Sequence, residues 1–247
     1  MQNYTQDYLL DKQITIYQPV DGYRASTDAV MLASLPERVR DGQKILDVGS
    51  GTGAISLCLA ERFKTKKVEI VGLELQPRLA ELANMSATAN GFDFLHYENI
   101  DIRQKMPANL PNCSFNHVIT NPPYAEKDMP SPNPSKAAAH NLSDCRLTDW
   151  LNFCIKMVAP KGFLYVINRA EAIDEMLAAL YGKMGNINLV PLFSKQGQPA
   201  KRIMLAAQKD SKAPTVIHAG LIIHQEDGSY TPEAQAILRK LGQTGTV

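Results

Sequence analysis

Apolar and polar positions change their spacing in a regular way from residue 44 onward. Short apolar runs of strand length alternate with longer stretches in which apolar residues recur at helical spacing. Such alternation is typical of a mostly parallel β-sheet covered by helices on both faces. The expected strands are 44–50, 68–75, 94–101, 115–120 and 162–168.

The helices expected between these strands are identified by apolar side chains that share one helical face. They are Ile55, Cys58 and Leu59; Leu79, Leu82, Ala83 and Ala87; Leu147, Leu151, Cys154 and Ile155; and Ile173, Met176, Leu177 and Leu180. A last helix is expected to start at "TPEAQ", because Thr231 is a good cap and Pro232 suits the first helical turn.

The end of the sheet is expected to be antiparallel. Runs 187–194 and 202–209 are joined by "KQGQPAK", which is too short to contain a crossover helix. We therefore expect an α/β domain with a seven-stranded, mostly parallel sheet and a C-terminal antiparallel strand pair. The predicted division of 1–247 is an N-terminal extension (1–40), a core (41–210) and a C-terminal appendage (211–247).

The composition agrees with one domain. With 247 residues, 45% of them hydrophobic, the chain can bury a full core. Its formal net charge of +1 gives no general attraction to nucleic acid or membranes. A polyanionic partner would therefore have to meet a local basic patch.

Metal, membrane and export functions find no support in the sequence. The four cysteines form no CxxC pair and match no zinc-site spacing, which predicts reduced thiols and no metal. The first residues lack the basic start and apolar core of a signal peptide, and no run approaches the roughly 18 apolar residues of a membrane span. We expect a cytoplasmic protein with no membrane partner.

The strongest candidate for ligand binding is "DVGSGTG", residues 47–53. Asp47 ends the first strand, and Gly49, Gly51 and Gly53 precede a helix, so the backbone can turn tightly and approach a ligand closely. The GxGxG spacing is one residue shorter than the GxGxxG that wraps a dinucleotide pyrophosphate. A cofactor other than NAD is therefore expected in this crevice.

Two acidic residues follow at the ends of the next strands. Glu74 in "VGLELQP" can accept hydrogen bonds from both hydroxyls of an unphosphorylated ribose. Asp101 in "NIDIRQ" is suited to an adenine amine. Either acid alone could be a solvated strand end, but their order behind the glycine turn favours a nucleoside-containing cofactor.

The motif "NPPY", residues 121–124, directly follows the strand 115–120, and two adjacent prolines cannot continue a sheet. It is either a rigid turn or a stiff frame around a substrate. An adenine amine is a poor nucleophile until acceptors on its hydrogens draw the nitrogen toward tetrahedral geometry. Asn121 and a carbonyl near Pro122 can supply these acceptors, and Tyr124 can stack on a base taken out of its own stack.

These four motifs, in this order, resemble those of class I S-adenosylmethionine-dependent methyltransferases. The runs "QPVDGYRASTDAVMLA" and "GQPAKRIMLAAQK" extend the resemblance to the small bacterial tRNA1(Val) (adenine-N6) methyltransferase family, over almost the whole chain. The resemblance implies a Rossmann-like fold, S-adenosyl-L-methionine as cofactor, and a tRNA or other RNA substrate. The implied reaction is methylation of an exocyclic amine, adenine N6 beside the anticodon.

The resemblance also implies roles for individual residues. Arg24 and Thr27 of "RASTD" approach the methionine end of the cofactor, where Arg can pair with a carboxylate and Thr can donate to it. An alternative for Ser26 and Thr27 is a helix cap. The implied cofactor-binding set is Arg24, Thr27, Asp47, Gly49, Gly51, Gly53, Glu74, Asp101 and Asn121, and the implied catalytic set is Asn121, Pro122 and Tyr124.

Substrate contacts are less well defined. The candidate set is Pro123, His140, Lys195, Lys201 and Arg202. The last three form a local excess of positive charge near the end of the predicted sheet, so they either meet RNA phosphates or belong to a solvated loop. This chain reads "AAHN" at 138–141, where the family often carries an "ARHE"-like run. The proline-rich segment 125–140 is expected to be a mobile lid.

Three other functions stay open. The first is methylation of a protein glutamine, whose side-chain amide also carries a planar NH2 group that the same motif can bind. Enzymes of that kind usually carry a helical substrate domain ahead of the cofactor loop, and only 46 residues precede Asp47 here. Another nucleobase amine, in rRNA or DNA, is the second alternative. A binding module without catalysis is the third, and the presence of Asn121 and Tyr124 argues against it.

Overall fold

One large β-sheet forms the centre of the protein, whose computed structural model describes residues 3–22, 24–124 and 145–240. Its strands run in the order β10-β8-β9-β7-β6-β3-β4-β5, and β11 also pairs with β8. All neighbours are parallel except that β9 runs antiparallel to both β7 and β8. The seven longer strands are β3 (Lys44–Val48), β4 (Glu69–Glu74), β5 (Leu95–Asn99), β6 (Phe115–Thr120), β7 (Val158–Arg169), β8 (Met184–Phe193) and β9 (Ala200–Lys209).

These strands confirm the predicted α/β fold, including the antiparallel pair β8 and β9. The expected strand number was wrong, because the sheet has nine strands within the described residues. The two additional strands, β10 (Val216–Ile217) and β11 (Leu221–Ile222), are each two residues long and pair with the edge of β8. Strands this short contain no alternation that a sequence pattern could reveal.

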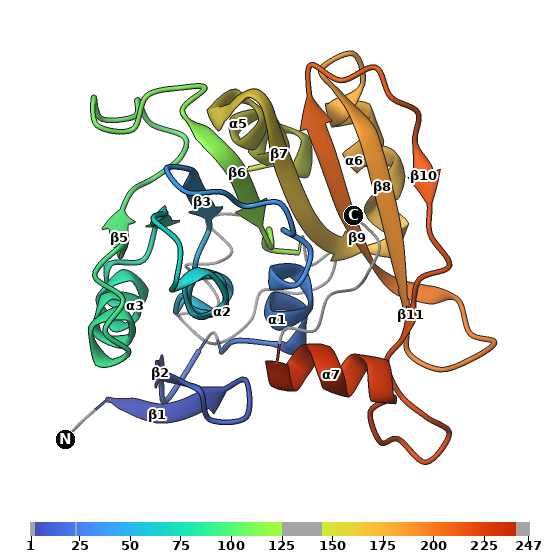
Figure 1. The fold of residues 1–247 in the computed structure, drawn as a ribbon, viewed down its shortest axis with the longest axis horizontal. Helices are drawn as coiled ribbons and strands as arrows, with labels where there is room; N and C mark the ends of the chain where they lie inside the picture. Colours follow the sequence, from blue (N-terminus) through green and yellow to red (C-terminus); the bar gives the residue numbers. More distant parts are fainter. Residues whose placement is uncertain (1–2, 23, 125–144, 241–247) are drawn as a thin grey trace.

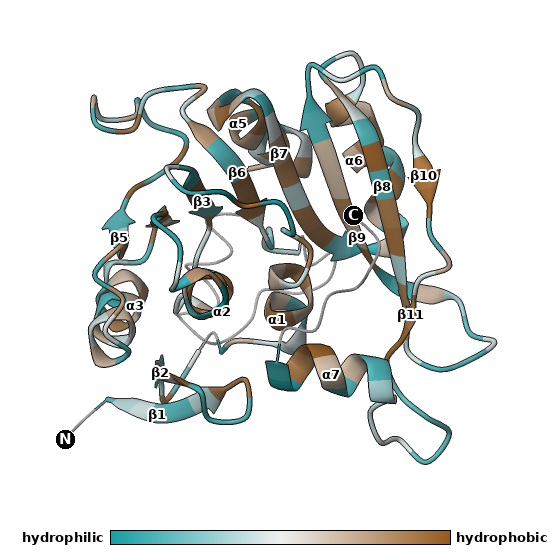
Figure 2. Ribbon diagram, in the orientation of Figure 1, coloured by the Kyte–Doolittle hydropathy of each residue, from teal (hydrophilic) through white to brown (hydrophobic). Residues whose placement is uncertain are grey.

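Helices cover both faces of the sheet (Figure 1). One face is covered by α1 (Thr27–Ala33), α2 (Ala54–Phe63), α3 (Pro77–Ala89) and α7 (Pro232–Lys240), and the other by α5 (Leu147–Met157) and α6 (Ile173–Leu180). Figure 2 shows apolar residues concentrated on the central strands, with mainly hydrophilic connecting loops. In α7 the predicted cap is present, because the backbone N–H of Ala234 donates to Thr231 Oγ1. No described helix has the length and apolarity needed to cross a bilayer.

The N-terminal segment forms a hairpin, which the sequence patterns did not predict. Its strands are β1 (Tyr4–Leu9) and β2 (Ile14–Pro19), paired antiparallel. Ile14 and Ile16 of β2 are fully buried in the core cluster on the α2 side of the sheet. Asn90, at the end of α3, accepts from Thr15 N at 2.9 Å and donates to Thr15 O at 2.7 Å. Ser86 Oγ on α3 also accepts from Tyr17 N at 2.9 Å. The hairpin is therefore fixed to the domain by apolar burial and by these side-chain hydrogen bonds.

The order of the strands places a crevice at one edge of the sheet. The chain leaves β3 toward β4 and β5, and then returns to the other side of β3 to form β6. In open α/β sheets, ligands bind outside the carboxyl ends of the strands where the strand order reverses in this way. The glycine turn after β3, Glu74 at the end of β4 and Asn121 after β6 all lie at this edge.

We expect the Asn90→Ala substitution to lower the free energy of unfolding by about 1 to 3 kcal/mol, because it leaves the backbone polar groups of Thr15 without partners. Chemical denaturation measures this change. The matched control is Asn112→Ala at an exposed position, expected to change stability by less than about 0.5 kcal/mol. Equal stability of the two variants would contradict the proposed role of Asn90.

Candidate functional site

The turn after β3 depends on the absence of side chains at its glycines. Gly49, Gly51 and Gly53 have φ values of 73°, 57° and 87°, in the left-handed region that favours glycine. A Cβ atom at Gly49 would lie 2.7 Å from Trp150 Cζ2, and one at Gly53 would collide with the ring of Tyr97. The turn is therefore packed between two aromatic side chains and tolerates no larger residue at these two positions.

Glu74 ties the end of β4 to this turn. Its Oε2 accepts from the backbone N–H of Gly51 at 2.8 Å, and its Oε1 accepts from that of Gln76 at 2.8 Å. Burial raises the pKa of Glu74, and the backbone donors oppose that rise. Each carboxylate oxygen has two acceptor positions, so each retains one for a further donor such as a ribose hydroxyl.

Asp47 is fully buried below the turn and is only partly hydrogen-bonded. Ser56 Oγ donates to its Oδ2 at 2.8 Å, whereas Oδ1 has no hydrogen-bond partner among the described residues. Burial raises the pKa of Asp47 to about 7, and the nearby Glu74 charge adds to this effect. Ser50 Oγ and Thr52 Oγ1 in the same turn are also buried without a partner in the described part of the chain. Three buried polar atoms at this turn thus lack the hydrogen bonds that buried polar groups normally make.

A narrow pocket opens beside the turn. Gly49 and Glu74 line it together with the apolar side chains of Leu73, Leu75, Ile100, Ile102 and Trp150. Apolar walls with one carboxylate suit a flat heterocycle linked to a sugar. The structure therefore brings together the first two predicted cofactor motifs in one pocket.

Asp101 lies two residues beyond the end of β5, rather than at its last residue as the sequence suggested. Its carboxylate pairs with the Arg103 guanidinium, Nε to Oδ1 at 2.9 Å and Nη2 to Oδ2 at 2.8 Å. These hydrogen bonds lower the pKa of Asp101. Both neighbours, Ile100 and Ile102, line the pocket described above, so Asp101 lies at its rim, and its contact with an adenine amine stays a prediction.

The "NPPY" motif begins directly after β6, at the same edge of the sheet. The Tyr124 hydroxyl donates to Asp28 Oδ2 at 2.9 Å, and Asn121 Oδ1 is 3.4 Å from that hydroxyl. A hydroxyl has one hydrogen to donate, so the shorter contact takes it. The Asn121 carbonyl oxygen therefore remains available as an acceptor, as the sequence argument requires.

Positive charge surrounds the Tyr124 ring. The guanidinium carbon of Arg202 lies 4.7 Å from the ring centroid and that of Arg169 lies 5.3 Å away, both within the range of cation–π attraction. Arg202 Nε also donates to Asp28 Oδ2 at 3.0 Å. Burial and the Asp28 charge raise the pKa of Tyr124, so its hydroxyl stays a neutral donor.

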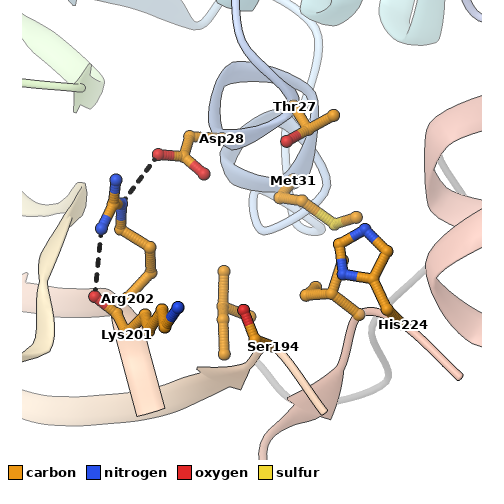
Figure 3. Close-up of a pocket in the computed structure, with 9 residues that line it drawn as sticks. Thr27, Asp28, Met31, Ser194, Lys201, Arg202 and His224 are labelled. Carbon is orange, nitrogen blue, oxygen red and sulfur yellow. Dashed lines mark hydrogen bonds and ion pairs between the residues drawn. The ribbon is translucent and has the colours of Figure 1, made fainter. Parts of the chain in front are cut away.

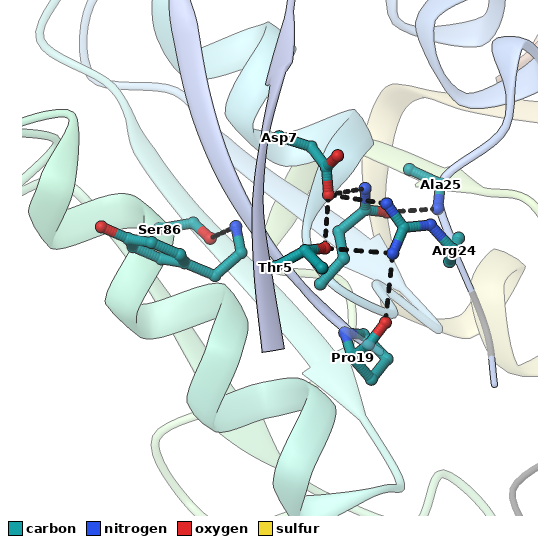
Figure 4. Close-up of polar contacts among 8 residues, drawn as sticks. Thr5, Asp7, Pro19, Arg24, Ala25 and Ser86 are labelled. Atoms are coloured by element: carbon teal, nitrogen blue, oxygen red, sulfur yellow. Dashed lines mark hydrogen bonds and ion pairs between the residues drawn. The ribbon is translucent and has the colours of Figure 1, made fainter. Parts of the chain in front are cut away.

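The two residues assigned to the methionine end of the cofactor lie in other surroundings. Arg24 Nη2 donates to Asp7 Oδ2 at 2.7 Å and Nη1 donates to Thr5 Oγ1 at 3.1 Å, which ties it to the N-terminal hairpin (Figure 4). Thr27 lines a second pocket with residues of β8 and β9 (Figure 3). Ser26 is the N-cap residue of α1, but no cap hydrogen bond from a side chain is present. The cofactor roles of Arg24 and Thr27 stay predictions.

The remaining candidates differ in exposure. Pro122 is buried and Pro123 is exposed. Lys195 Nζ donates to Glu226 O at 2.7 Å, while Lys201 is exposed at the start of β9. His140 and the expected lid 125–140 lie outside the described residues. No group of His, Cys, Asp or Glu side chains in the described ranges could hold a metal ion.

Three residues of the site were missed by the sequence analysis. Trp150 Nε1 donates to Thr120 Oγ1 at 2.9 Å, which joins the end of β6 to the glycine turn. Tyr97 packs on Gly53, and Asp28 holds Tyr124. Trp150 had a usable signal, because it is the one tryptophan of the sequence. Tyr97 and Asp28 resemble an ordinary core residue and an ordinary first-turn acid.

Comparisons with known proteins agree with this geometry. A family model described as the methyltransferase small domain matches residues 25–142. A crystal structure of a predicted O-methyltransferase from Agrobacterium tumefaciens superimposes with a TM-score of 0.69 at 26% identity, covering 85% of this chain and 94% of that one. These matches show an S-adenosylmethionine-dependent methyltransferase with the class I fold.

Relatives of this methyltransferase include proteins named tRNA1(Val) (adenine(37)-N6)-methyltransferase. That of Actinobacillus succinogenes is 27% identical over 223 residues, 88% of this chain and 89% of the relative. That of Porphyromonas gingivalis is 28% identical over 234 residues, 90% of this chain and 89% of the relative. A 16S rRNA N2 G1207 methyltransferase from T. thermophilus, solved with AdoMet and guanosine, shares the fold at a TM-score of 0.58 and 19% identity, covering 83% of this chain and 50% of that one.

The residues present fit S-adenosylmethionine, the cofactor of this methyltransferase. When bound, the cofactor supplies a methyl group activated by a positively charged sulfur. Glu74 retains acceptors for ribose hydroxyls, and the pocket beside Gly49 has the apolar walls that an adenine needs.

We expect the Glu74→Ala variant of the methyltransferase to bind S-adenosylmethionine about 1.5 to 3 kcal/mol more weakly, because charge-assisted hydrogen bonds are lost. Isothermal titration calorimetry measures this affinity. Glu69→Ala is the matched control, since Glu69 lies at the other end of β4 and pairs with Lys44 on the surface. Unchanged affinity in Glu74→Ala would remove Glu74 from the cofactor site.

Proposed function

We propose that this methyltransferase transfers a methyl group to the exocyclic N6 amine of an adenine in tRNA, beside the anticodon. The observation that carries the proposal is the free acceptor of Asn121, next to the Tyr124 ring, at the sheet edge that also holds the glycine turn. The names of the relatives support tRNA as the substrate class. We expect the reaction to take place in the cytoplasm, where tRNA is modified.

The proposed methyl transfer depends on the position of the adenine amine more than on a general base. The Asn121 carbonyl oxygen accepts one hydrogen of the amine, and a backbone carbonyl near Pro122 accepts the other, which localises the nitrogen lone pair. Positive charge builds on the nitrogen during transfer, and these oxygens stabilise it. The buried position of Pro122 keeps the carbonyl and the Asn121 side chain in a fixed relation. The amine proton can leave to solvent afterwards.

Tyr124 is the proposed platform for the flipped adenine. Its hydroxyl is held by Asp28 and its ring lies against two guanidinium groups, so the side chain is positioned before the base arrives. The flipped base stacks beside this ring, where the guanidinium groups of Arg169 and Arg202 also lie. The two guanidinium groups also place positive charge next to a polyanionic substrate, although the chain as a whole carries a net charge of only +1.

The Asn121→Ala substitution tests the chemistry apart from binding. We expect turnover on an unmodified valine tRNA transcript to fall by about a hundredfold or more, because a hydrogen-bond partner of the transition state is removed. Cofactor affinity should stay nearly unchanged. Asn112→Ala, at the opposite edge of the sheet before β6, serves as the control and should retain full turnover. Activity of Asn121→Ala within a factor of a few would make "NPPY" a structural turn.

Two lysines beside the site are the proposed phosphate-binding residues, because Arg202 is engaged with Asp28 and Tyr124. Replacing Lys195 and Lys201 together by Ala should weaken tRNA binding and reduce the slope of log affinity against log salt by about 0.7 to 0.9 for each phosphate that is no longer neutralised. Filter binding over a salt series measures this slope. The control with the same change of charge is Lys66→Ala with Lys67→Ala, at exposed positions before β4. Equal slopes in both double variants would exclude the patch from the RNA path.

A further inference from the structure

A second pocket lies next to the Tyr124 cluster and contains none of the glycine-turn residues. It is enclosed by α1, by the facing ends of β8 and β9, and by the chain around His224 (Figure 3). Backbone hydrogen bonds hold its far wall in place: Ile223 N donates to Phe193 O at 2.8 Å, and His224 N donates to Ser194 O at 3.0 Å. The pocket is therefore built into the framework of the sheet.

The Asp28 and Arg202 side chains separate this pocket from Tyr124. Both line the pocket, while the same Asp28 oxygen binds the Tyr124 hydroxyl and Arg202 lies over the Tyr124 ring. Asp28 Oδ1 makes no hydrogen bond within the described ranges, and Figure 3 shows it on the side away from Arg202. A ligand in the pocket would thus be a direct neighbour of a base stacked on Tyr124.

The lining of the pocket has both apolar and polar parts. Met31 and Leu192 are buried side chains that form an apolar floor. Above them stand the hydroxyl of Ser194, the hydroxyl of Thr27 and the ammonium of Lys201, which has no partner in the described part of the chain. The imidazole of His224 is stacked on Tyr230 with ring centroids 5.0 Å apart and also borders the pocket.

This combination fits a nucleoside with a phosphate at its edge. A lone anion would be repelled by Asp28 and would not use the apolar floor. A base can lie against Met31, Leu192 and the His224 ring, with its polar edge toward Asp28 Oδ1 and Ser194. Lys201 then lies at the rim, where a phosphate of the strand would pass.

We propose that this pocket binds the base of the nucleotide that directly neighbours the target adenine in the RNA strand. The proposal rests on the proposed function, because it places two successive bases on the two sides of the Asp28–Arg202 pair. It makes Ser194 and His224 determinants of sequence context rather than of chemistry, while Lys201 holds a phosphate of the strand. The target adenine is recognised by "NPPY", and its neighbour is recognised by this second pocket.

The test uses two changes. One is an enzyme variant in which a side chain fills the pocket, and the other is an RNA that lacks the neighbouring base. Ser194→Phe places a ring in the pocket, and Gln196→Phe places the same ring on an exposed neighbour that does not line it. The substrates are an anticodon stem–loop of valine tRNA and the same RNA with an abasic nucleotide before or after the target adenine. Initial rates of methyl transfer give kcat/KM for each combination, and calorimetry checks that cofactor affinity is unchanged.

Wild type should show a drop of about tenfold in kcat/KM on one of the two abasic RNAs, in line with the contribution of one stacked base. Ser194→Phe should show a similar drop on the intact RNA and no further drop on that abasic RNA, while Gln196→Phe should behave as wild type. Abasic neighbours that wild type tolerates fully, or equal behaviour of the two Phe variants, would overturn the second base site alone. A full-length valine tRNA transcript is assayed in parallel, and absence of transfer to it by wild type would instead overturn the proposed function, and this inference with it.

Discussion

The pair of backbone hydrogen bonds to Glu74 is the interaction on which the rest of the site depends. By accepting from Gly51 N and Gln76 N, the carboxylate fixes the glycine turn after β3 against the start of α3 after β4. The ring of Trp150 packs on this turn at Gly49. The indole N–H of Trp150 donates to Thr120, the last residue before "NPPY". Cofactor pocket and methyl-acceptor motif are therefore connected through one continuous set of contacts.

The cost of this arrangement is electrostatic. Asp47 and Glu74 are both buried carboxylates, and burial raises the pKa of each. A fold selected for stability alone would not leave Asp47 Oδ1, Ser50 Oγ and Thr52 Oγ1 without partners. These atoms are explained when the turn is read as a binding site whose ligand completes the hydrogen bonding. Around Tyr124 the carboxylate charge is compensated by a cation, because Asp28 pairs with Arg202. The same Asp28 oxygen also accepts from the Tyr124 hydroxyl.

Local sequence patterns predicted most of the sheet and the position of the site. The sequence placed the glycine turn, Glu74 and "NPPY" each after a predicted strand, and β3, β4 and β6 bring them to the edge where the carboxyl ends of parallel strands meet. The hairpin was missed because its attachment depends on Asn90, far along the chain. The role of Asp28 was missed for the same reason, since its partners come from the distant Tyr124 and Arg202. Arg24 forms an ion pair with the Asp7 carboxylate on β1. No local sequence pattern predicts this contact.

The proposed activity is methylation of an adenine amine in tRNA. Its most direct test is the transfer of a labelled methyl group from S-adenosylmethionine, by the purified full chain, to total bacterial RNA and to total bacterial protein in parallel. We expect label in the tRNA fraction, recovered after digestion as N6-methyladenosine from one position. Label on protein glutamine, on another nucleobase, or on neither fraction despite cofactor binding would contradict it.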